Sequence, residues 1–128
     1  SRNFAMMFGS PYFSFDPNAD YILFIEDHER FSKPDAVSEY LAAIWQHPFM
    51  RRVRGFIFGC YNNAGTPPEE LVALLALIGE RYDIPVAYTN DIGHGTRHGV
   101  LPMGCRVRLD GGAGTLEFLE RTIARRKS

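Results

Sequence analysis

Two side chains in this sequence have the chemistry of a proton-transfer pair, and each follows an apolar segment. Glu26 comes directly after the run Tyr21–Ile25, and His94 lies in the glycine-flanked loop that follows Ile84–Tyr88. A carboxylate can accept the Nδ1 proton of an imidazole, fix its tautomer and stabilise the imidazolium that forms when the ring takes a proton from a nucleophile. Glu26 and His94 are therefore candidates for general acid–base catalysis.

The same residues also allow two other interpretations. A carboxylate at the end of a strand is more often a solvated or helix-capping group than a catalytic one. A metal site is the second alternative, with His94 and His98 as ligands beside Glu26, Asp27 or His28. Histidines four residues apart share one face of zinc-binding helices, but the glycines around His94 disfavour a helix here. From residue types alone, all three interpretations stay open.

Other features that could bind or react favour structural roles. Cys60 and Cys105 lie in apolar segments without CxxC spacing, which is typical of buried thiols in a reducing compartment. The run Gly111–Gly114 has no helix or lysine after it, which indicates a turn between strands and not a phosphate-binding loop. Aromatic side chains near the start are expected to cover a core rather than line a ligand groove; they are Phe4, Phe8, Tyr12, Phe13 and Phe15.

Length and composition describe one ordinary globular domain. The chain has 128 residues, 45% of them hydrophobic, and a net charge of −1, so nothing predicts a nucleic-acid partner. Basic residues cluster near the end, where they are interpreted as a solvated helix terminus; they are Arg121, Arg125, Arg126 and Lys127. Apolar stretches fall far short of the roughly 20 residues of a membrane span, and a signal peptide is missing. We expect a cytoplasmic protein with no membrane partner.

The apolar pattern predicts the elements that must position Glu26 and His94. Tyr21–Ile25 and Gly55–Cys60 are apolar without alternation, which predicts strands buried on both faces, the first of them central in its sheet. Apolar residues at helical spacing predict a helix between them that ends before Pro48. Two strands joined by a helix form a βαβ unit, for which a right-handed crossover is expected.

The second half of the chain predicts one more helix, one more buried strand and a hairpin. Thr66, followed by prolines and acidic residues, is expected to cap a helix that runs to about Tyr82. Ile84–Tyr88 predicts a strand and residues 90–99 a loop, whereas Cys105–Leu109 and Thr115–Leu119 alternate around a glycine turn, as an antiparallel hairpin does. The prediction is an α/β domain with a mixed or partly parallel sheet, a second small antiparallel sheet and two main helices. Reactive groups in such sheets gather beyond the carboxyl ends of the strands.

The order of the segments carries a family resemblance over nearly the whole chain. The succession is Asn3–Tyr12, Ile22–Asp27, Gly55–Gly59, Ile84–Val86, Gly93–His94, Leu101–Gly104 and Arg108–Asp110. This ordered set resembles the C-terminal domain of the LD-carboxypeptidase family, which includes muramoyltetrapeptide carboxypeptidases and microcin C self-immunity peptidases. The stretch Phe31–Arg54 is atypical of that family, with Gln46–Met50 where its members usually have a glycine-containing turn, which leaves the subfamily and the substrate open.

The resemblance implies a Ser-Glu-His triad that is divided between two domains. Glu26 matches the family's glutamate after an apolar strand, and His94 matches the histidine of its Gly-His loop. The nucleophilic serine is implied to lie in an N-terminal domain, and Ser10, Ser14, Ser32 and Ser38 do not match it. The resemblance further implies a swivelling β/β/α-type domain, a homodimer and no metal or organic cofactor. The implied substrates are murein peptides with an amide bond between an L- and a D-centre, or peptide-nucleotide compounds related to microcin.

We therefore expect residues 1–128 to form a single domain, the C-terminal catalytic half of a two-domain serine carboxypeptidase. Its partner is expected to be its own N-terminal domain, and the isolated chain is expected to be inactive because a triad without its nucleophile loses several orders of magnitude in rate. The alternative is a non-catalytic ligand-binding or dimerisation module with the same fold.

Overall fold

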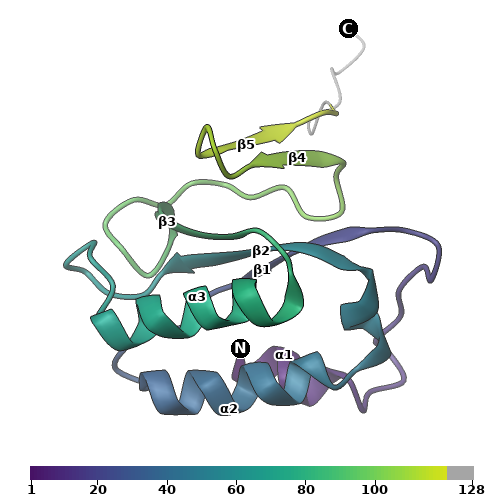
Figure 1. Cartoon of the computed structure of the whole chain (residues 1–128), viewed down its shortest axis with the longest axis horizontal. Coiled ribbons are helices and arrows are strands. Elements are labelled where there is room, and N and C mark those ends of the chain that lie inside the picture. Colours follow the sequence, from purple (N-terminus) through teal and green to yellow (C-terminus); the bar gives the residue numbers. More distant parts are fainter. Residues whose placement is uncertain (121–128) are drawn as a thin grey trace, which may run out of the picture.

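The computed structural model describes residues 1–120, which form three layers of helices and strands (Figure 1). In chain order the elements are α1 (Arg2–Met7), β1 (Tyr21–Ile25), α2 (Pro34–Trp45), the 3₁₀ helix η1 (Pro48–Arg52), β2 (Val53–Cys60), α3 (Glu69–Tyr82), β3 (Val86–Gly93), β4 (Val107–Asp110) and β5 (Thr115–Phe118). The basic residues at positions 121, 125, 126 and 127, interpreted above as a helix terminus, lie outside the described residues.

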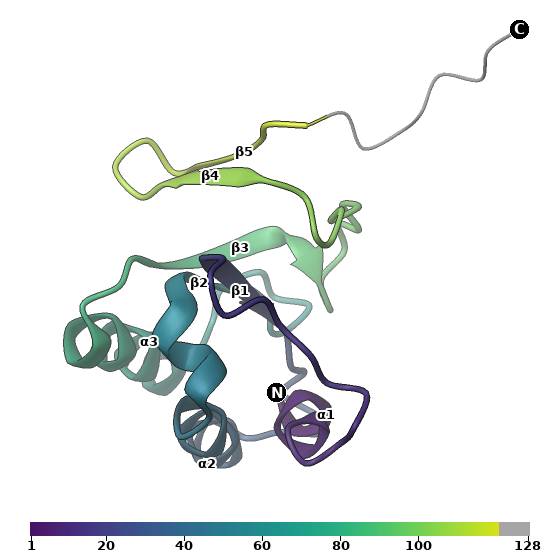
Figure 2. The ribbon, with the colours of Figure 1, turned by 90° about the vertical axis from the view of Figure 1, so that its right-hand side faces the viewer.

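The layers are arranged as helices, a parallel sheet and an antiparallel hairpin. Strands β1, β2 and β3 form a parallel sheet in the order β1-β2-β3, and β4 pairs with β5 in antiparallel fashion. Figure 2 shows α1, α2 and α3 on one side of the parallel sheet and the β4–β5 hairpin on its other side. This β/β/α layering confirms the predicted α/β fold with a second small antiparallel sheet.

The core lies between the parallel sheet and the helices. Phe56 and Phe58 of β2 are fully buried, and they pack with apolar residues that helical spacing places on one face of α2 and one face of α3. Those helical residues are Val37, Leu41, Ile44, Leu71, Leu75 and Ile78. Burying each side chain of this size contributes roughly 1.5–3 kcal/mol, so this layer dominates the stability of the fold.

The aromatic side chains near the start of the chain cover one edge of this core. Phe4, Phe8, Phe13 and Phe15 are partly buried against the core cluster, as the sequence predicted. The interpretation is wrong for Tyr12, which is 89% exposed. His47 joins the aromatic group, since its ring stacks on Phe8 with centroids 4.2 Å apart and its side chain accepts a hydrogen bond from the Phe49 N–H.

Three details of the predicted elements are wrong. The apolar run Tyr21–Ile25 is an edge strand and not a central one, because the order β1-β2-β3 places β2 in the middle. Helix α3 has Pro68 as its N-cap residue rather than Thr66, since the two prolines hold the chain extended until Glu69. Strand β3 runs to Gly93, so it takes up the first part of the predicted loop 90–99.

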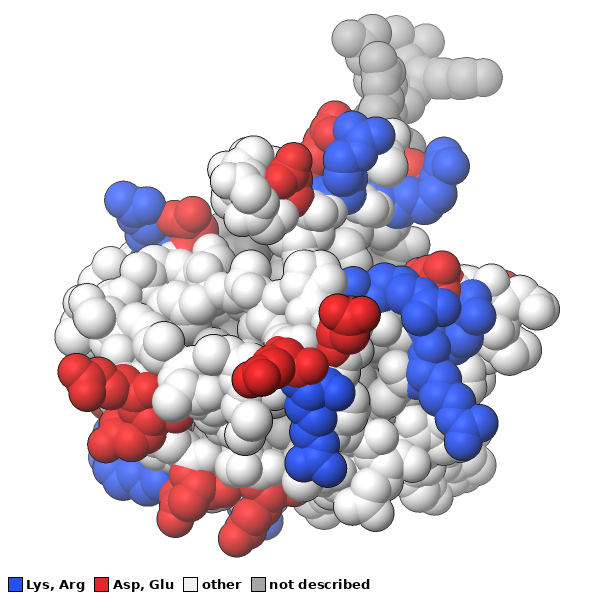
Figure 3. Space-filling model, in the orientation of Figure 1, with Lys and Arg blue, Asp and Glu red and all other residues white. Residues whose placement is uncertain are grey.

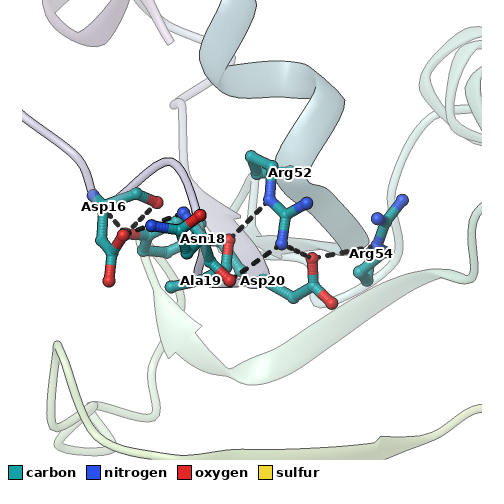
Figure 4. A network of polar contacts seen from close by, with 7 residues as sticks. Asp16, Asn18, Ala19, Asp20, Arg52 and Arg54 are labelled. Carbon is teal, nitrogen blue, oxygen red and sulfur yellow. Dashed lines mark hydrogen bonds and ion pairs between the residues drawn. The ribbon is translucent and has the colours of Figure 1, made fainter.

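A polar network fixes the chain where it enters β1 (Figure 4). The Arg52 guanidinium donates from Nε to the carbonyl oxygen of Ala19 (2.9 Å) and from Nη2 to that of Asn18 (3.1 Å), and it pairs with Asp20 at 2.7 Å. Arg54 reaches the same carboxylate at 3.2 Å. These contacts join the end of η1 and the start of β2 to the loop before β1.

Charged side chains of both signs are spread over the face seen in Figure 3, and no single sign covers it. Several of them form exposed ion pairs, such as Arg97 with Asp91 (2.8 Å) and Arg108 with Glu117 (3.0 Å). Within the described residues, no helix has the length and apolarity that crossing a membrane requires.

Candidate active site

Strands β1 and β3 place Glu26 and His94 on either side of the end of β2. Glu26 follows Ile25, which pairs with Phe58 of β2, and His94 follows Gly93, which pairs with Cys60. Between them lies Gly59, where an added Cβ would come within 3.1 Å of Glu26 Cβ and 3.0 Å of the Ile92 carbonyl oxygen. The absence of a side chain at Gly59 therefore leaves the space in which the two outer strand ends approach each other.

Glu26 and His94 line one open cavity of about 710 Å³. Asp27, His28, Ser32 and the start of α1 complete its wall. Both Glu26 and His94 are exposed to solvent, and neither the Glu26 carboxylate nor the His94 ring has a side-chain hydrogen bond to another residue in the described part of the chain. The fold thus brings the two predicted side chains to the same cavity, with their polar atoms still accessible to a partner or ligand.

The backbone of the His94 loop is held tightly against the end of β2. The His94 N–H donates to the carbonyl oxygen of Cys60 at 2.8 Å. Gly93 has φ +118°, a conformation that other residues rarely adopt, and a Cβ there would lie 2.6 Å from the Cys60 nitrogen. Gly95 is buried, and a Cβ there would lie 2.5 Å from Cys60 Sγ. Glycines at both neighbours of His94 are therefore required by close contact with Cys60.

His28 is a second imidazole in the cavity. Its ring lies edge-on to that of His94, with centroids 5.1 Å apart, and its Nδ1 accepts the backbone N–H of Arg30 at 3.0 Å. The sequence suggested His28 only as one possible metal ligand. The available signal was its position two residues after Glu26, but only the turn of the chain after β1 brings its ring back beside His94.

Asp27 is an acidic side chain of the cavity wall, and its Oδ2 pairs with the amino group of Ser1 at 3.0 Å. Asp27 Oδ1 accepts a hydrogen bond from the buried Ser32 hydroxyl at 3.4 Å. Behind it, the Tyr61 hydroxyl donates to the Ser32 carbonyl oxygen. Burial raises the pKa of Tyr61, and the negative charges of Glu29 and Asp27 raise it further, so this phenol stays protonated as a donor at neutral pH.

The two serines at the cavity wall do not complete a catalytic set with His94. The Ser32 hydroxyl is committed to Asp27, and Ser1 Oγ is buried without a hydrogen-bond partner among residues 1–120. Neither hydroxyl makes a hydrogen bond to the His94 ring. The cavity therefore brings a carboxylate and an imidazole together, with no serine hydroxyl hydrogen-bonded to the imidazole within the described residues.

The described residues do not support the metal alternative. No three His, Cys, Asp or Glu side chains within residues 1–120 are grouped so that they could hold a metal ion. His98, the proposed second ligand, is exposed and does not line the cavity that contains His94.

Comparison with known families decides where this chain belongs. The family described as LD-carboxypeptidase C-terminal domain matches residues 2–109. The chain belongs to this family. As an LD-carboxypeptidase C-terminal domain, it contains both Glu26 and His94 within the matched residues. A search of curated proteins gives no match.

A solved structure supports the fold of this LD-carboxypeptidase C-terminal domain. The chain superposes on the crystal structure of muramoyltetrapeptide carboxypeptidase from Oxalobacter formigenes with a TM-score of 0.70 and 24% sequence identity. The match covers 90% of this chain but only 40% of that protein. At this identity the likeness establishes the β/β/α fold, and the activity of the longer protein is a separate question.

Proposed function

We propose that this domain supplies the Glu-His part of a Ser-Glu-His triad for a serine carboxypeptidase. The observation that carries the proposal is that Glu26 and His94, from two different strands, line one open cavity at the carboxyl ends of the parallel sheet. Membership in the LD-carboxypeptidase C-terminal domain family supports a peptidase. The nucleophilic serine belongs to the protein's own N-terminal domain, which covers the exposed side of the cavity.

In the proposed reaction His94 acts first as general base and then as general acid. The ring removes the proton from the serine hydroxyl as the hydroxyl oxygen attacks the amide carbonyl, and it then gives that proton to the leaving amine. Glu26 accepts a hydrogen bond from the other ring nitrogen, which fixes the tautomer and stabilises the imidazolium. Water then hydrolyses the acyl-enzyme by the same proton transfers in reverse. The protein acts without a metal or organic cofactor.

The proposed substrates are L,D-amide bonds in murein peptides or in related microcin-like compounds, cleaved in the cytoplasm by a homodimer. The relative from Oxalobacter formigenes, a muramoyltetrapeptide carboxypeptidase, supports the murein branch of this proposal. The open cavity of about 710 Å³ has room for the end of a short peptide.

The test is hydrolysis of a murein tetrapeptide by the full-length protein that contains this domain. Glu26→Gln and His94→Ala should each lower kcat by about a thousandfold or more, because the residues of a triad act as a unit. Matched controls are Glu29→Gln and His98→Ala, which change the same residue types at exposed positions that do not line the cavity. Full activity in either triad variant, or equal losses in the controls, would contradict the proposal.

The alternative is a ligand-binding or dimerisation module that keeps the fold without catalysis. The absence of hydrogen bonds to the Glu26 and His94 side chains among residues 1–120 is compatible with this alternative as well. The same experiment separates the two functions. Such a module predicts that the full-length protein binds the peptide without releasing its terminal residue, whatever residue stands at position 94.

A further inference from the structure

His28 is a titratable side chain of the cavity that lies next to His94 and that the proposed proton transfers do not use. It is half-buried, lines the same cavity, and its ring centroid lies 5.1 Å from that of His94. We propose that His28 binds the terminal carboxylate of the peptide substrate and so makes the site selective for the last residue of a chain. This inference rests on the proposed carboxypeptidase function.

A local hydrogen bond fixes which nitrogen of His28 can face a ligand. Nδ1 accepts the Arg30 N–H at 3.0 Å, so the neutral ring carries its proton on Nε2. One carbon separates Nδ1 from Nε2 in the imidazole ring, and the two nitrogens point in different directions. Because Nδ1 faces the Arg30 N–H, Nε2 points away from that backbone group. His28 therefore presents an N–H donor on the side of the ring that is not committed to the chain.

The geometry of carboxypeptidase chemistry places a carboxylate close to this donor. His94 must reach the nitrogen of the scissile amide in order to protonate the leaving amine. In the residue that is released, the carboxylate carbon is only two bonds from that nitrogen, which is a separation of about 2.5 Å from standard backbone dimensions. A donor whose ring lies beside that of His94 is thus within reach of the terminal carboxylate.

The charges around the cavity explain why such a donor is needed. Glu26 and Asp27 both line the cavity and disfavour an anionic ligand, whereas Arg2 lines it with a positive charge. Asp27 is partly neutralised by its ion pair with the amino group of Ser1 at 3.0 Å, and Glu26 is assigned to His94. Since a hydrogen bond to an ionised group is roughly twice as strong as a neutral one, His28 can hold a carboxylate in place against this background.

Two substitutions separate carboxylate binding from a structural role of His28. His28→Asn keeps an acceptor near the position of Nδ1, as in an Asx turn to the Arg30 N–H, but it has no donor at the position of Nε2. His28→Gln places an amide N–H near the position of Nε2 and loses the short-range acceptor. A structural role predicts that Asn is tolerated and Gln is not, and carboxylate binding predicts the reverse.

The experiment measures kcat/KM of the full-length protein for one L,D-tetrapeptide with a free terminal carboxylate and for the same peptide with a terminal amide. We expect kcat/KM for the free acid divided by kcat/KM for the amide to fall about tenfold or more in His28→Asn. In His28→Gln this ratio should stay within a few-fold of the wild-type value. Thermal unfolding of both variants controls for misfolding.

The outcomes distinguish this inference from the proposed function. The role of His28 would be overturned by an unchanged ratio in His28→Asn. It would also be overturned if only His28→Gln lost kcat/KM and lost it equally for both peptides. In either case, activity that depends on Glu26 and His94 would still support the triad. A wild-type protein that cleaves neither peptide would overturn the proposed function, and the carboxylate assignment with it.

Discussion

Gly95→Ala should displace His94 and destabilise the domain, because the new methyl group meets a side chain that cannot move away. An ideal Cβ at Gly95 would lie 2.5 Å from Cys60 Sγ, whereas non-bonded heavy atoms pack at about 3.5–4.0 Å. Relief therefore needs a shift of about 1 Å. Cys60 is 1% exposed, and its thiol donates to the Asn62 carbonyl oxygen at 3.1 Å, so the loop that carries His94 must move instead.

The size of the effect follows from these contacts. Overpacking of a close-packed site costs about 1–3 kcal/mol in the free energy of unfolding. The shift also weakens the hydrogen bond from the His94 N–H to the Cys60 carbonyl oxygen, now 2.8 Å. A catalytic group misplaced by about 1 Å can lose about a hundredfold in rate, so we expect a larger loss in kcat than in stability.

The assay combines denaturant unfolding of this domain with peptide hydrolysis by the full-length protein. Cys60→Ala removes the clashing sulfur and leaves Cys60 Cβ, which lies 3.3 Å from the added atom, so the double variant should regain part of both losses. A double-mutant cycle should give a coupling energy of about 1–2 kcal/mol. Gly111→Ala, at a position with nothing within 4 Å of the added Cβ, is the matched control and should change stability by less than about 0.5 kcal/mol.

Two results would refute this reasoning. Gly95→Ala could be as stable and as active as the wild type, in which case the loop is free to relax and Cys60 does not position His94. Alternatively, Cys60→Ala could add its own loss to that of Gly95→Ala, in which case the contact between the two side chains is not the cause.

Two further predictions concern the scaffold. Arg52→Ala should cost about 1–2 kcal/mol in the free energy of unfolding, since it leaves two carbonyl oxygens without their donor, whereas Arg54→Ala, which removes one exposed ion pair, should cost less than about 0.5 kcal/mol in the same urea titration. Burial raises the pKa of both Tyr61 and Tyr88, so their contribution to stability should be complete below the ordinary tyrosine pKa of about 10 and be lost as the pH rises through the raised values. The second prediction would be contradicted if the free energy of unfolding did not fall as the pH rises above about 10. It would also be contradicted if that fall were equally large in Tyr88→Phe, which lacks the Tyr88 hydroxyl that accepts the Tyr61 N–H.

The sequence was informative wherever apolar residues form an uninterrupted or a periodic pattern. Tyr21–Ile25 is β1 to the residue, and helical spacing located α2. The position of β1 at the sheet edge could not be predicted, because a strand covered by aromatic residues and by a hairpin has the same apolar run as a central strand. The end of β3 was missed since Asn90 and Asp91 are exposed at this edge and therefore polar.

The candidate site was predictable only as far as parallel topology determines it. Because the carboxyl ends of parallel strands meet at one edge, two residues that follow such strands, Glu26 and His94, were expected to approach each other, and they line one cavity. The place of His28 depends on how the chain turns after β1. That turn is held by hydrogen bonds from the Arg30 N–H to His28 Nδ1 and from the Glu29 N–H to the Tyr61 carbonyl oxygen, which have no periodic signal in the sequence. The catalytic roles of Glu26 and His94 stay a prediction.

The most direct test of the proposed triad is a crystal structure of the full-length protein. The account predicts that a serine of the preceding domain lies with its Oγ at about 2.6–3.2 Å from one ring nitrogen of His94, or somewhat farther without a ligand, and that the Glu26 carboxylate faces the other nitrogen. A structure in which no serine approaches His94, or in which Glu26 and His94 face different partners, would contradict it.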